Sequence, residues 1–495
     1  MTYRDRVAGC WAGKCLGGAA GMAFEGVPYR PRLTADRICL QNVPNDDLEL
    51  QLVWLVAMER HGLALDAGDL GRAWLAHIPA GCDEYCIALR NLRHGIMPPY
   101  SGYVDNCFAD GMGAAIRSEI WAALFPGQPD TAARYASYDA MVDHWGDGVY
   151  AEMFLAAAES IAFGGGAIAT ALREARGRIP AECRVGDTID EVFARHDRGD
   201  LTLDDAVVWT SDHFRHANFT DCAMNLAAVV TALLWGEGDV TRTVLAAVNC
   251  GRDTDCTAAT CGALLGIARG AAAMPPEWLA RLDDRLALSA FVEAVPGVPL
   301  TLTDMTARTV ALSRRLGRPA PPTEPLYVPC APAPRPAVLP TARWLVTELP
   351  AHEAAALAET LRTTGRCPAE WQDRIITTGD LQVDLSAFAH DANTLDLFTF
   401  LEVHNPPETV VLSVTADVGL TLWIDGVRLV NHHSRQLSIP SFHRAEGGAA
   451  FAYPVADGDR KLVHLRLYNC LPPLHGALLF GGLDNNHLEC CRLTI

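Results

Sequence analysis

Two short acidic clusters contain the residues of this sequence that are best suited to chemistry. Asn45-Asp46-Asp47 opens an apolar run at residues 48–58, and Asp253-Thr254-Asp255 opens a run of small residues at 257–273. A helix N-terminus has four unpaired N–H groups and a partial positive charge, so one Asp can cap each helix. Capping needs a single carboxylate, whereas each cluster supplies two.

If the clusters meet in the folded chain, four carboxylates share one place. At an effective dielectric constant near 20, two like charges about 4 Å apart repel each other by about 4 kcal/mol. Protonation or a hard cation relieves this repulsion, and Mg²⁺ and Ca²⁺ accept several carboxylate oxygens as ligands. The spacing alone leaves two interpretations open, a divalent-metal site or two separately capped helices.

Residues 1–316 predict an all-α domain that would position both clusters. Apolar residues recur at intervals of three and four in the runs 48–58, 151–163, 222–235 and 240–248. Glycines fall on every fourth residue in two stripes, one running from Gly9 to Gly21 and the other from Gly262 to Gly270. Residues four apart share a helix face, so each stripe predicts a surface that another helix approaches closely.

The composition changes after residue 316. Nine prolines within residues 317–340 predict an interdomain linker, because proline fits neither a helix interior nor a central strand. Beyond it, five short runs are rich in Val, Leu, Thr and aromatic residues, and Asp425-Gly426 predicts a two-residue hairpin turn between two of them. We expect an antiparallel β-sandwich at residues 341–495. The five runs are 394–403, 409–415, 420–424, 427–430 and 462–468.

The overall composition narrows the possible partners. Forty Lys and Arg against fifty-nine Asp and Glu give a net charge of −19, so we expect no nucleic-acid partner. Sixteen dispersed cysteines fit buried thiols in a reducing compartment better than a disulfide scaffold. No segment qualifies as a secretory signal or a membrane span, which favours a cytoplasmic protein without a membrane partner. The oligomeric state stays open.

Four segments in the first 275 residues form an ordered set. They are a glycine-rich helix from Asp5 that leads to Glu25, then Asn45-Asp46-Asp47, then the run His144-Trp145-Gly146-Asp147-Gly148-Val149-Tyr150, and last Gly251-Arg252-Asp253-Thr254-Asp255. In type, order and spacing they resemble the ADP-ribosylglycohydrolase family, the all-helical hydrolases that remove ADP-ribose from modified proteins.

The resemblance implies a centre of one or two divalent ions, Mg²⁺ first and Mn²⁺ or Ca²⁺ as other options, that holds ribose hydroxyls and a water. It assigns the catalytic roles to Glu25, Asp46 and Asp253. The implied metal ligands are Asn45, Asp46, Asp47, Asp253 and Asp255. The implied substrate-binding residues are Gly111, Gly113, His144, Asp147 and Tyr150. For His144 the residues themselves favour a structural role at a helix start over substrate contact, and the same alternative applies to Asp147 and Tyr150.

Several positions depart from the family's pattern. Asn45 and Cys256 stand where the family has threonines near the metals, and a thiol is a poor ligand for Mg²⁺. Gly18 replaces an Asp, and Met112 replaces the Asn of a Gly-Asn-Gly loop. We therefore expect that both the metal contacts and the substrate contacts have changed.

Our leading hypothesis is a metal-dependent hydrolase that cleaves an N- or O-glycosidic bond at the anomeric carbon of an ADP-ribosyl or related ribose-like sugar. One alternative is an O-glycosidase that acts on a furanosyl or other carbohydrate without ADP-ribose. Another is a non-catalytic binder of ADP-ribose or a sugar. The hairpin at 420–430 is similar to accessory β-sandwich modules of carbohydrate-active enzymes, which favours a sugar conjugate as ligand.

Overall fold

The computed structural model describes residues 1–495 apart from 28, 41–43, 45, 293–294, 328–338 and 392. The chain forms two compact units. The first contains Met1–Pro79 and Met97–Pro332, and the second contains Ala80–Ile96 and Ala333–Ile495. Among the described residues, no helix has both the length and the apolar character that a membrane crossing requires.

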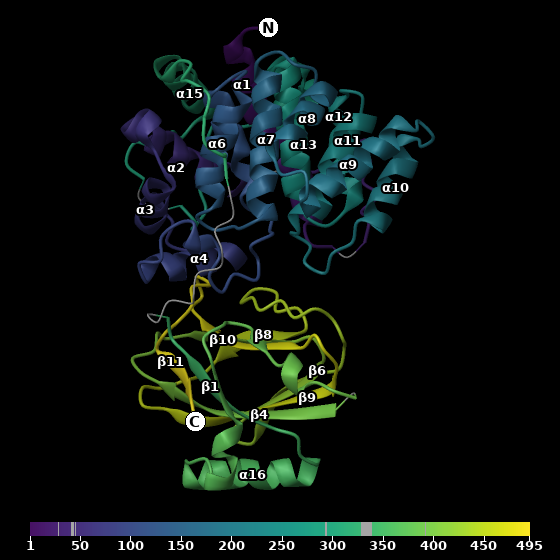
Figure 1. Ribbon diagram of the computed structural model, residues 1–495. Coiled ribbons are helices and arrows are strands. Elements are labelled where there is room, and N and C mark those ends of the chain that lie inside the picture. The colour runs from purple at the N-terminus through teal and green to yellow at the C-terminus, as the bar shows by residue number, and fades with distance from the viewer. Residues whose placement is uncertain (28, 41–43, 45, 293–294, 328–338, 392) are drawn as a thin grey trace. The chain divides into compact units, whose positions relative to one another are not determined.

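The first unit is built from helices, as the sequence predicts, and Figure 1 shows them in colours that run from purple at α1 through blue and teal to green at α15. Its α-helices are α1 (Tyr3–Gly21), α2 (Asp46–His61), α3 (Ala67–His77), α5 (Ser118–Leu124), α6 (Pro129–Ala140), α7 (Asp147–Phe163), α8 (Ile168–Ala175), α9 (Arg184–Asp197), α10 (Leu203–His213), α11 (Cys222–Trp235), α12 (Val240–Cys250), α13 (Thr254–Arg269), α14 (Pro276–Leu279) and α15 (Leu302–Leu316). Short 3-10 turns lie at Met22–Phe24, Ala35–Arg37, Gly62–Ala64, Tyr100–Gly102, Ala115–Arg117, Arg176–Arg178 and Ala271–Ala273.

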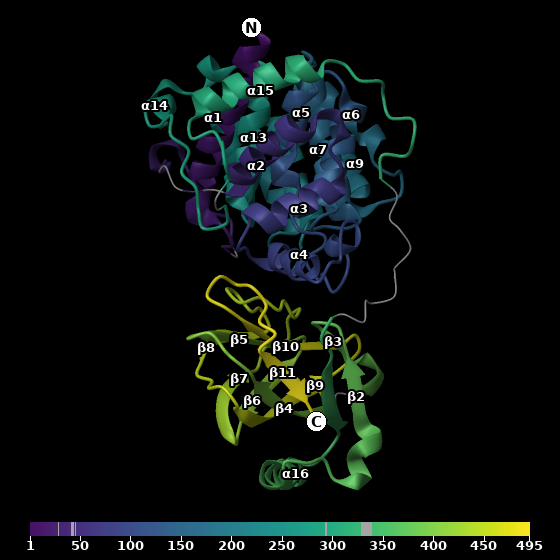
Figure 2. The same ribbon diagram turned by 90° about the vertical axis from the view of Figure 1, so that its left-hand side faces the viewer.

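Helices α1 and α13 pack against each other along both glycine stripes. A Cβ atom at Gly13 would lie 2.0 Å from the carbonyl oxygen of Gly262, and one at Gly9 would lie 2.3 Å from that of Gly266. The contacts run in opposite directions along the two helices, so the helices are antiparallel. The predicted close approach is confirmed, and the two stripes are each other's partners. Helix α15 packs across α1 (Figure 2).

Helix α13 is shorter than the run of small residues from which it is predicted. It ends at Arg269 because Gly270 has a φ of 78°, a conformation that closes a helix and that glycine adopts without strain. Residues 271–273 continue only as a 3-10 turn.

The second unit contains two antiparallel sheets. The larger has the strand order β2-β1-β4-β9-β6-β7, with β11 also paired to β4, and the smaller has the order β3-β10-β5-β8. The strands are β1 (Ala342–Thr347), β2 (Ile375–Thr378), β3 (Val383–Asp384), β4 (Asn393–Val403), β5 (Val410–Ala416), β6 (Gly419–Ile424), β7 (Val427–His432), β8 (Gly448–Tyr453), β9 (Arg460–Cys470), β10 (His475–Gly481) and β11 (Cys491–Thr494).

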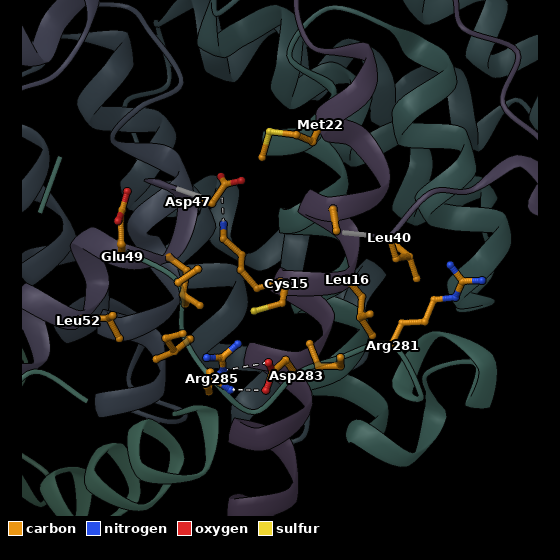
Figure 3. Close-up of a pocket in the computed structure, with 16 residues that line it drawn as sticks. Cys15, Leu16, Met22, Leu40, Asp47, Glu49, Leu52, Arg281, Asp283 and Arg285 are labelled. Carbon is orange, nitrogen blue, oxygen red and sulfur yellow. Dashed lines mark hydrogen bonds and ion pairs between the residues drawn. The ribbon is translucent and has the colours of Figure 1, made fainter. Parts of the chain in front are cut away.

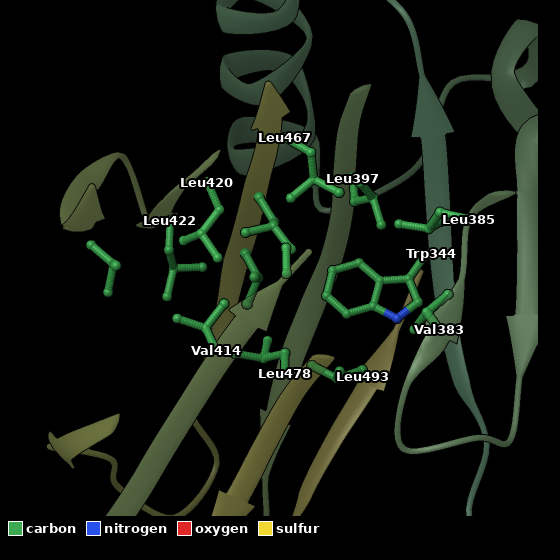
Figure 4. Packing of buried hydrophobic residues seen from close by; sticks show 14 of the residues in the cluster. Trp344, Val383, Leu385, Leu397, Val414, Leu420, Leu422, Leu467, Leu478 and Leu493 are labelled. Carbon is green, nitrogen blue, oxygen red and sulfur yellow. The ribbon is translucent and has the colours of Figure 1, made fainter. Parts of the chain in front are cut away.

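Both sheets contribute to one core, so the unit is the predicted β-sandwich. Trp344, Leu397 and Leu467 of the larger sheet meet Val414 and Leu478 of the smaller one (Figure 4). The predicted hairpin joins β6 to β7, and both of its turn residues have positive φ, 48° and 78°, as a type I′ turn requires. Every cysteine that the structure describes has a free thiol.

Two helices of the second unit were not expected there. The alanine-rich α16 (Ala351–Thr364) covers the outer face of the larger sheet (Figure 1). Leu357 and Leu361 of α16 pack with Phe398 and Phe400 of β4 in one buried cluster. Strand β4 is therefore buried on both faces and lacks the alternation of a half-exposed strand.

The second helix, α4 (Asp83–Arg93), lies between helices of the first unit in sequence but belongs to the second. Polar pairs attach it to loops of the sandwich. Arg444 pairs with the Asp83 carboxylate, and Nη1 of Arg93 donates to Oδ1 of Asn486 over 2.9 Å. The His94 ring pairs with Glu489.

Replacing Gly13 by Ala tests the contact between α1 and α13. The added methyl group would meet backbone atoms that cannot move aside, so we expect the free energy of unfolding to fall by about 1–3 kcal/mol or more. Gly177→Ala is the matched control, because no atom lies within 4 Å of its added Cβ. Denaturant titration measures both variants, and equal stability of the two would contradict the proposed packing.

Candidate functional site

The two acidic clusters meet in the first unit, and Glu25 joins them. Ligand-capable oxygen atoms of Glu25, Asp253 and Asp255 all lie within 4.8 Å of one another. A second group at the same mutual distance contains Asp47, Asp255 and the sulfur atom of Cys256. The groups share Asp255, so three distant segments of the chain form one continuous acidic centre.

The contact between α1 and α13 brings these segments together. At its end, a Cβ atom on Gly21 would lie 2.2 Å from the carbonyl oxygen of Thr254, whose hydroxyl donates to the Gly21 carbonyl over 2.8 Å. The chain then continues through one 3-10 turn to Glu25, and the N–H of Gly26 donates to the Arg252 carbonyl over 2.8 Å. Glu25 is thereby held beside the start of α13.

The aspartates at the start of α13 are buried, and Asp253 does not act as a helix cap. Asp253 occupies the N-cap position of α13, but its side chain makes no capping hydrogen bond. Asp47, Asp253 and Asp255 are only 1, 2 and 4% exposed, whereas Glu25 is exposed. Among the described residues, one oxygen of Asp253 and one of Asp255 are buried without a hydrogen-bond partner. At α13, separate capping therefore does not account for the acidic cluster.

Burial and mutual repulsion shift the ionisation of the cluster. Burial, followed by the charge of Glu25, raises the pKa of Asp253 from 3.8 to about 8. Burial and the neighbouring carboxylates also raise the pKa of Asp255 and of Asp46 well above the usual value. The charges of Asp47, Glu25 and Asp253 are among those that raise the pKa of Asp46.

Sequence reasoning missed the cation beside this centre. Lys14 on α1 is 1% exposed, and its ammonium nitrogen lies 2.8 Å from the Glu119 carboxylate and 3.7 Å from that of Asp47. Burial lowers the pKa of Lys14, but the charges of Glu119 and Asp47 more than compensate and raise it. A lysine between the glycines of a buried helix is the sequence signal that could have revealed it.

A pocket beside Asp47 extends from α1 and α2 to the segment 281–287. Figure 3 shows Asp47 at one end and the paired Arg285 and Asp283 at the other, with Leu16 and Leu52 among the apolar lining residues. The pocket opens next to the acidic centre and could take an apolar part of a bound molecule.

The predicted substrate-binding residues His144, Asp147 and Tyr150 make contacts other than those of the acidic centre. His144 is fully buried, and its Nδ1 lies 2.9 Å from the Asp143 carboxylate, so we do not include it among the residues proposed to touch a ligand. Asp147 accepts a hydrogen bond from the N–H of Val185 over 2.8 Å and so holds the start of α9. The Tyr150 ring packs against Tyr327, with the ring centroids 5.6 Å apart.

The glycine loop is fixed to α11. Gly111 forms an isolated β-bridge with Asp221, while Gly113 is half-buried. Arg184 stabilises this arrangement by pairing with Asp221 over 2.7 Å and with Asp110 over 3.2 Å. No short-range pattern in the sequence indicates these long-range pairs. Asn45, one of the predicted metal ligands, lies outside the described residues.

The acidic centre fits a hard cation. Glu25, Asp253 and Asp255 offer three carboxylates within reach of one ion, which is the ligand type that Mg²⁺ and Ca²⁺ prefer. The buried oxygens without partners and the raised pKa values are features that a bound cation relieves. Asp46 and Asp47 could complete the set, whereas the Cys256 thiol suits a softer metal.

The stability of the metal-free protein should depend on pH through Asp253. Between pH 3.8 and about 8 the folded chain holds a proton that the unfolded chain releases, so the free energy of unfolding should fall as the pH rises. Mg²⁺ competes with that proton and should raise the melting temperature more at pH 8 than at pH 5. Melting curves with and without Mg²⁺ check this, and Asp253→Asn should flatten the dependence. A wild-type slope equal to that of the variant would refute the assignment.

Replacing Lys14 by Met should destabilise the first unit strongly. The change leaves Glu119 and Asp47 buried without their cation, which typically costs about 3–5 kcal/mol. Adding Glu119→Gln to that variant should recover part of the loss, because one of the unpaired charges disappears. Denaturant titration of the two single variants and the double variant measures this coupling, and strictly additive effects would argue against it.

Comparison with known proteins gives one family match and several similar solved structures. A model of the ADP-ribosylglycohydrolase family matches residues 1–306. No curated protein matches the chain. Similar solved structures include an "ADP-ribosylglycohydrolase-related protein complex", with 21% identity, a TM-score of 0.42 and coverage of 64% of this chain and 99% of that one. Another is an anti-sigma factor domain-containing protein from Clostridium clariflavum, with 13% identity, a TM-score of 0.17 and coverage of 23% and 40%. The family match spans more than half of the chain, which therefore belongs to the ADP-ribosylglycohydrolase family.

Proposed function

We propose that the chain is a divalent-metal-dependent glycoside hydrolase that cleaves an N- or O-glycosidic bond at the anomeric carbon of a ribose-like sugar. Family membership indicates hydrolysis of a glycosidic bond in an ADP-ribosyl-like substrate. The observation that carries the finer proposal is the meeting of carboxylates from three separate segments at one buried centre. Several carboxylates buried together destabilise the fold, and a bound cation that also contacts a sugar would account for their arrangement.

The residues of the centre suit this reaction. The glycosidic bond breaks with its electron pair going to the leaving group, and the oxygen of a water molecule bonds to the anomeric carbon. Glu25 is exposed and fixed beside the cluster, so it can accept the proton of that water and pass it to the leaving group. Asp253 and Asp255, whose pKa values are raised in the metal-free chain, would ionise when a cation binds and would then hold it beside the sugar.

A divalent ion, when bound, would supply positive charge that lowers the pKa of a coordinated water and orients the sugar oxygens. Asp253, Asp255 and one carboxylate oxygen of Glu25 would hold it, and the other Glu25 oxygen would remain to accept the proton.

We further propose that this chain holds one hard cation rather than two. Of the two ligand groups, only the first consists of carboxylates alone. The second contains the Cys256 sulfur, and the Lys14 ammonium already lies 3.7 Å from its Asp47. A fixed positive charge and a thiol both disfavour Mg²⁺ at the second position.

Turnover by Asp255→Asn tests the proposed function. Asp255 belongs to both ligand groups, so its loss should reduce kcat by at least about 100-fold, the size of effect typical for an essential electrostatic group. The substrates are ADP-ribosyl-arginine, ADP-ribosyl-serine and an aryl ribofuranoside, each assayed with Mg²⁺, Mn²⁺ and Ca²⁺. Asp187→Asn, an exposed residue in the first turn of α9, is the control and should keep wild-type activity.

The panel also separates the alternatives. Cleavage of the ribofuranoside alone would indicate that the substrate is a carbohydrate without ADP-ribose. Tight binding of ADP-ribose without turnover under any metal would identify a non-catalytic binder and sink the hydrolase proposal. Wild-type rates in Asp255→Asn would remove the acidic centre from the mechanism.

A further inference from the structure

A second pocket of the first unit has the opposite charge to the acidic centre. It lies between the segment 29–32, the end of α10 and the end of α12. Four arginine residues line it, and the single acidic residue among its lining residues is Asp212. On a chain with a net charge of −19, such a concentration of positive charge is unusual. The four residues are Arg30, Arg32, Arg215 and Arg252.

The segment that carries Arg30 and Arg32 is fixed at both ends. At one end the N–H of Gly26 donates to the Arg252 carbonyl over 2.8 Å. At the other end the Asn249 side chain bonds both backbone polar groups of Leu33, and its Nδ2 donates to the Leu33 carbonyl over 3.0 Å. The backbone beside Arg32 is therefore anchored to the end of α12, which reduces the ordering that a ligand must impose.

Most of the positive charge in this arginine pocket is not neutralised by the protein. Arg215 bonds to the Asp212 side chain over 2.8 Å and to its carbonyl over 3.0 Å. Among the residues that the structure describes, no carboxylate forms an ion pair with Arg30, Arg32 or Arg252. Arginine stays protonated at any physiological pH, so these groups keep their charge and repel one another unless an anion lies between them.

We propose that the arginine pocket binds a phosphate or diphosphate group of a small-molecule ligand. Guanidinium groups donate paired N–H bonds to phosphate oxygens, and several converging arginines match a group with two or more negative charges better than a single carboxylate. The hydroxyl of Ser211 adds a further donor to the lining. This proposal does not depend on the proposed hydrolase activity.

Two sources could supply that phosphate. Arg252 directly precedes Asp253, so the phosphate could belong to the same compound whose sugar lies at the acidic centre. It could equally come from a separate phosphorylated ligand that binds at the same time.

Calorimetry with inorganic pyrophosphate and inorganic phosphate, on the full metal-free chain, tests the proposal. We expect saturable binding of pyrophosphate by the wild type and at least tenfold weaker binding by Arg30→Gln/Arg32→Gln, which corresponds to about 1.4 kcal/mol. The matched control is Arg4→Gln/Arg198→Gln, which removes two exposed arginines elsewhere on the same unit and should bind like the wild type. Melting curves verify that each variant is folded.

A second variant should increase the affinity for pyrophosphate. Asp212→Asn removes the one carboxylate of the pocket and should tighten pyrophosphate binding. The absence of saturable binding in the wild type, or an equal loss in both double variants, would overturn the proposal. If ADP-ribose displaces pyrophosphate, the phosphate belongs to the substrate. If both bind together, it belongs to a separate ligand.

Discussion

The contact between the backbones of α1 and α13 is the constraint on which the candidate site depends. Because Gly13 and Gly262 lack side chains, the helices approach until backbone meets backbone, and they run in opposite directions. This arrangement places the end of α1 beside the start of α13. Glu25, which follows α1, is thereby brought to Asp253 and Asp255. A bulkier residue in either stripe would shift one carboxylate away from the others.

Several charged side chains of the first unit are buried in its interior. Lys14 pairs with Glu119, and the fully buried Arg117 lies 3.0 Å from Asp139 and 2.9 Å from Asp143. These networks provide each buried charge with a partner, as burial requires. The acidic centre differs, because one buried oxygen of Asp253 and one of Asp255 have no hydrogen-bond partner among the described residues. That difference separates a centre suited to an external cation from interior ion pairs that need none.

Local patterns in the sequence predicted much of this structure. The apolar period predicted α11 at the bounds that are observed, and Asp425-Gly426 predicted its hairpin turn. The two acidic clusters could be identified because a helix start needs one capping carboxylate, whereas each cluster contains two. Lys14, the arginine pocket and the place of α4 were missed, since each depends on contacts between segments far apart in the chain. Helix α16 was not predicted, although Leu357 and Leu361 lie four residues apart on one helix face.

The second unit is built from two separate stretches of the chain, Ala80–Ile96 and Ala333–Ile495. The polypeptide crosses between the units after Pro79, after Ile96 and after Pro332. Cleavage by a protease in the proline-rich segment would sever only the last of these crossings. The released sandwich would still hold α4 through Arg444 and Asn486, and α4 is continuous with the helical unit on both sides. The two fragments would therefore co-purify after such a nick, as the halves of a split protein do.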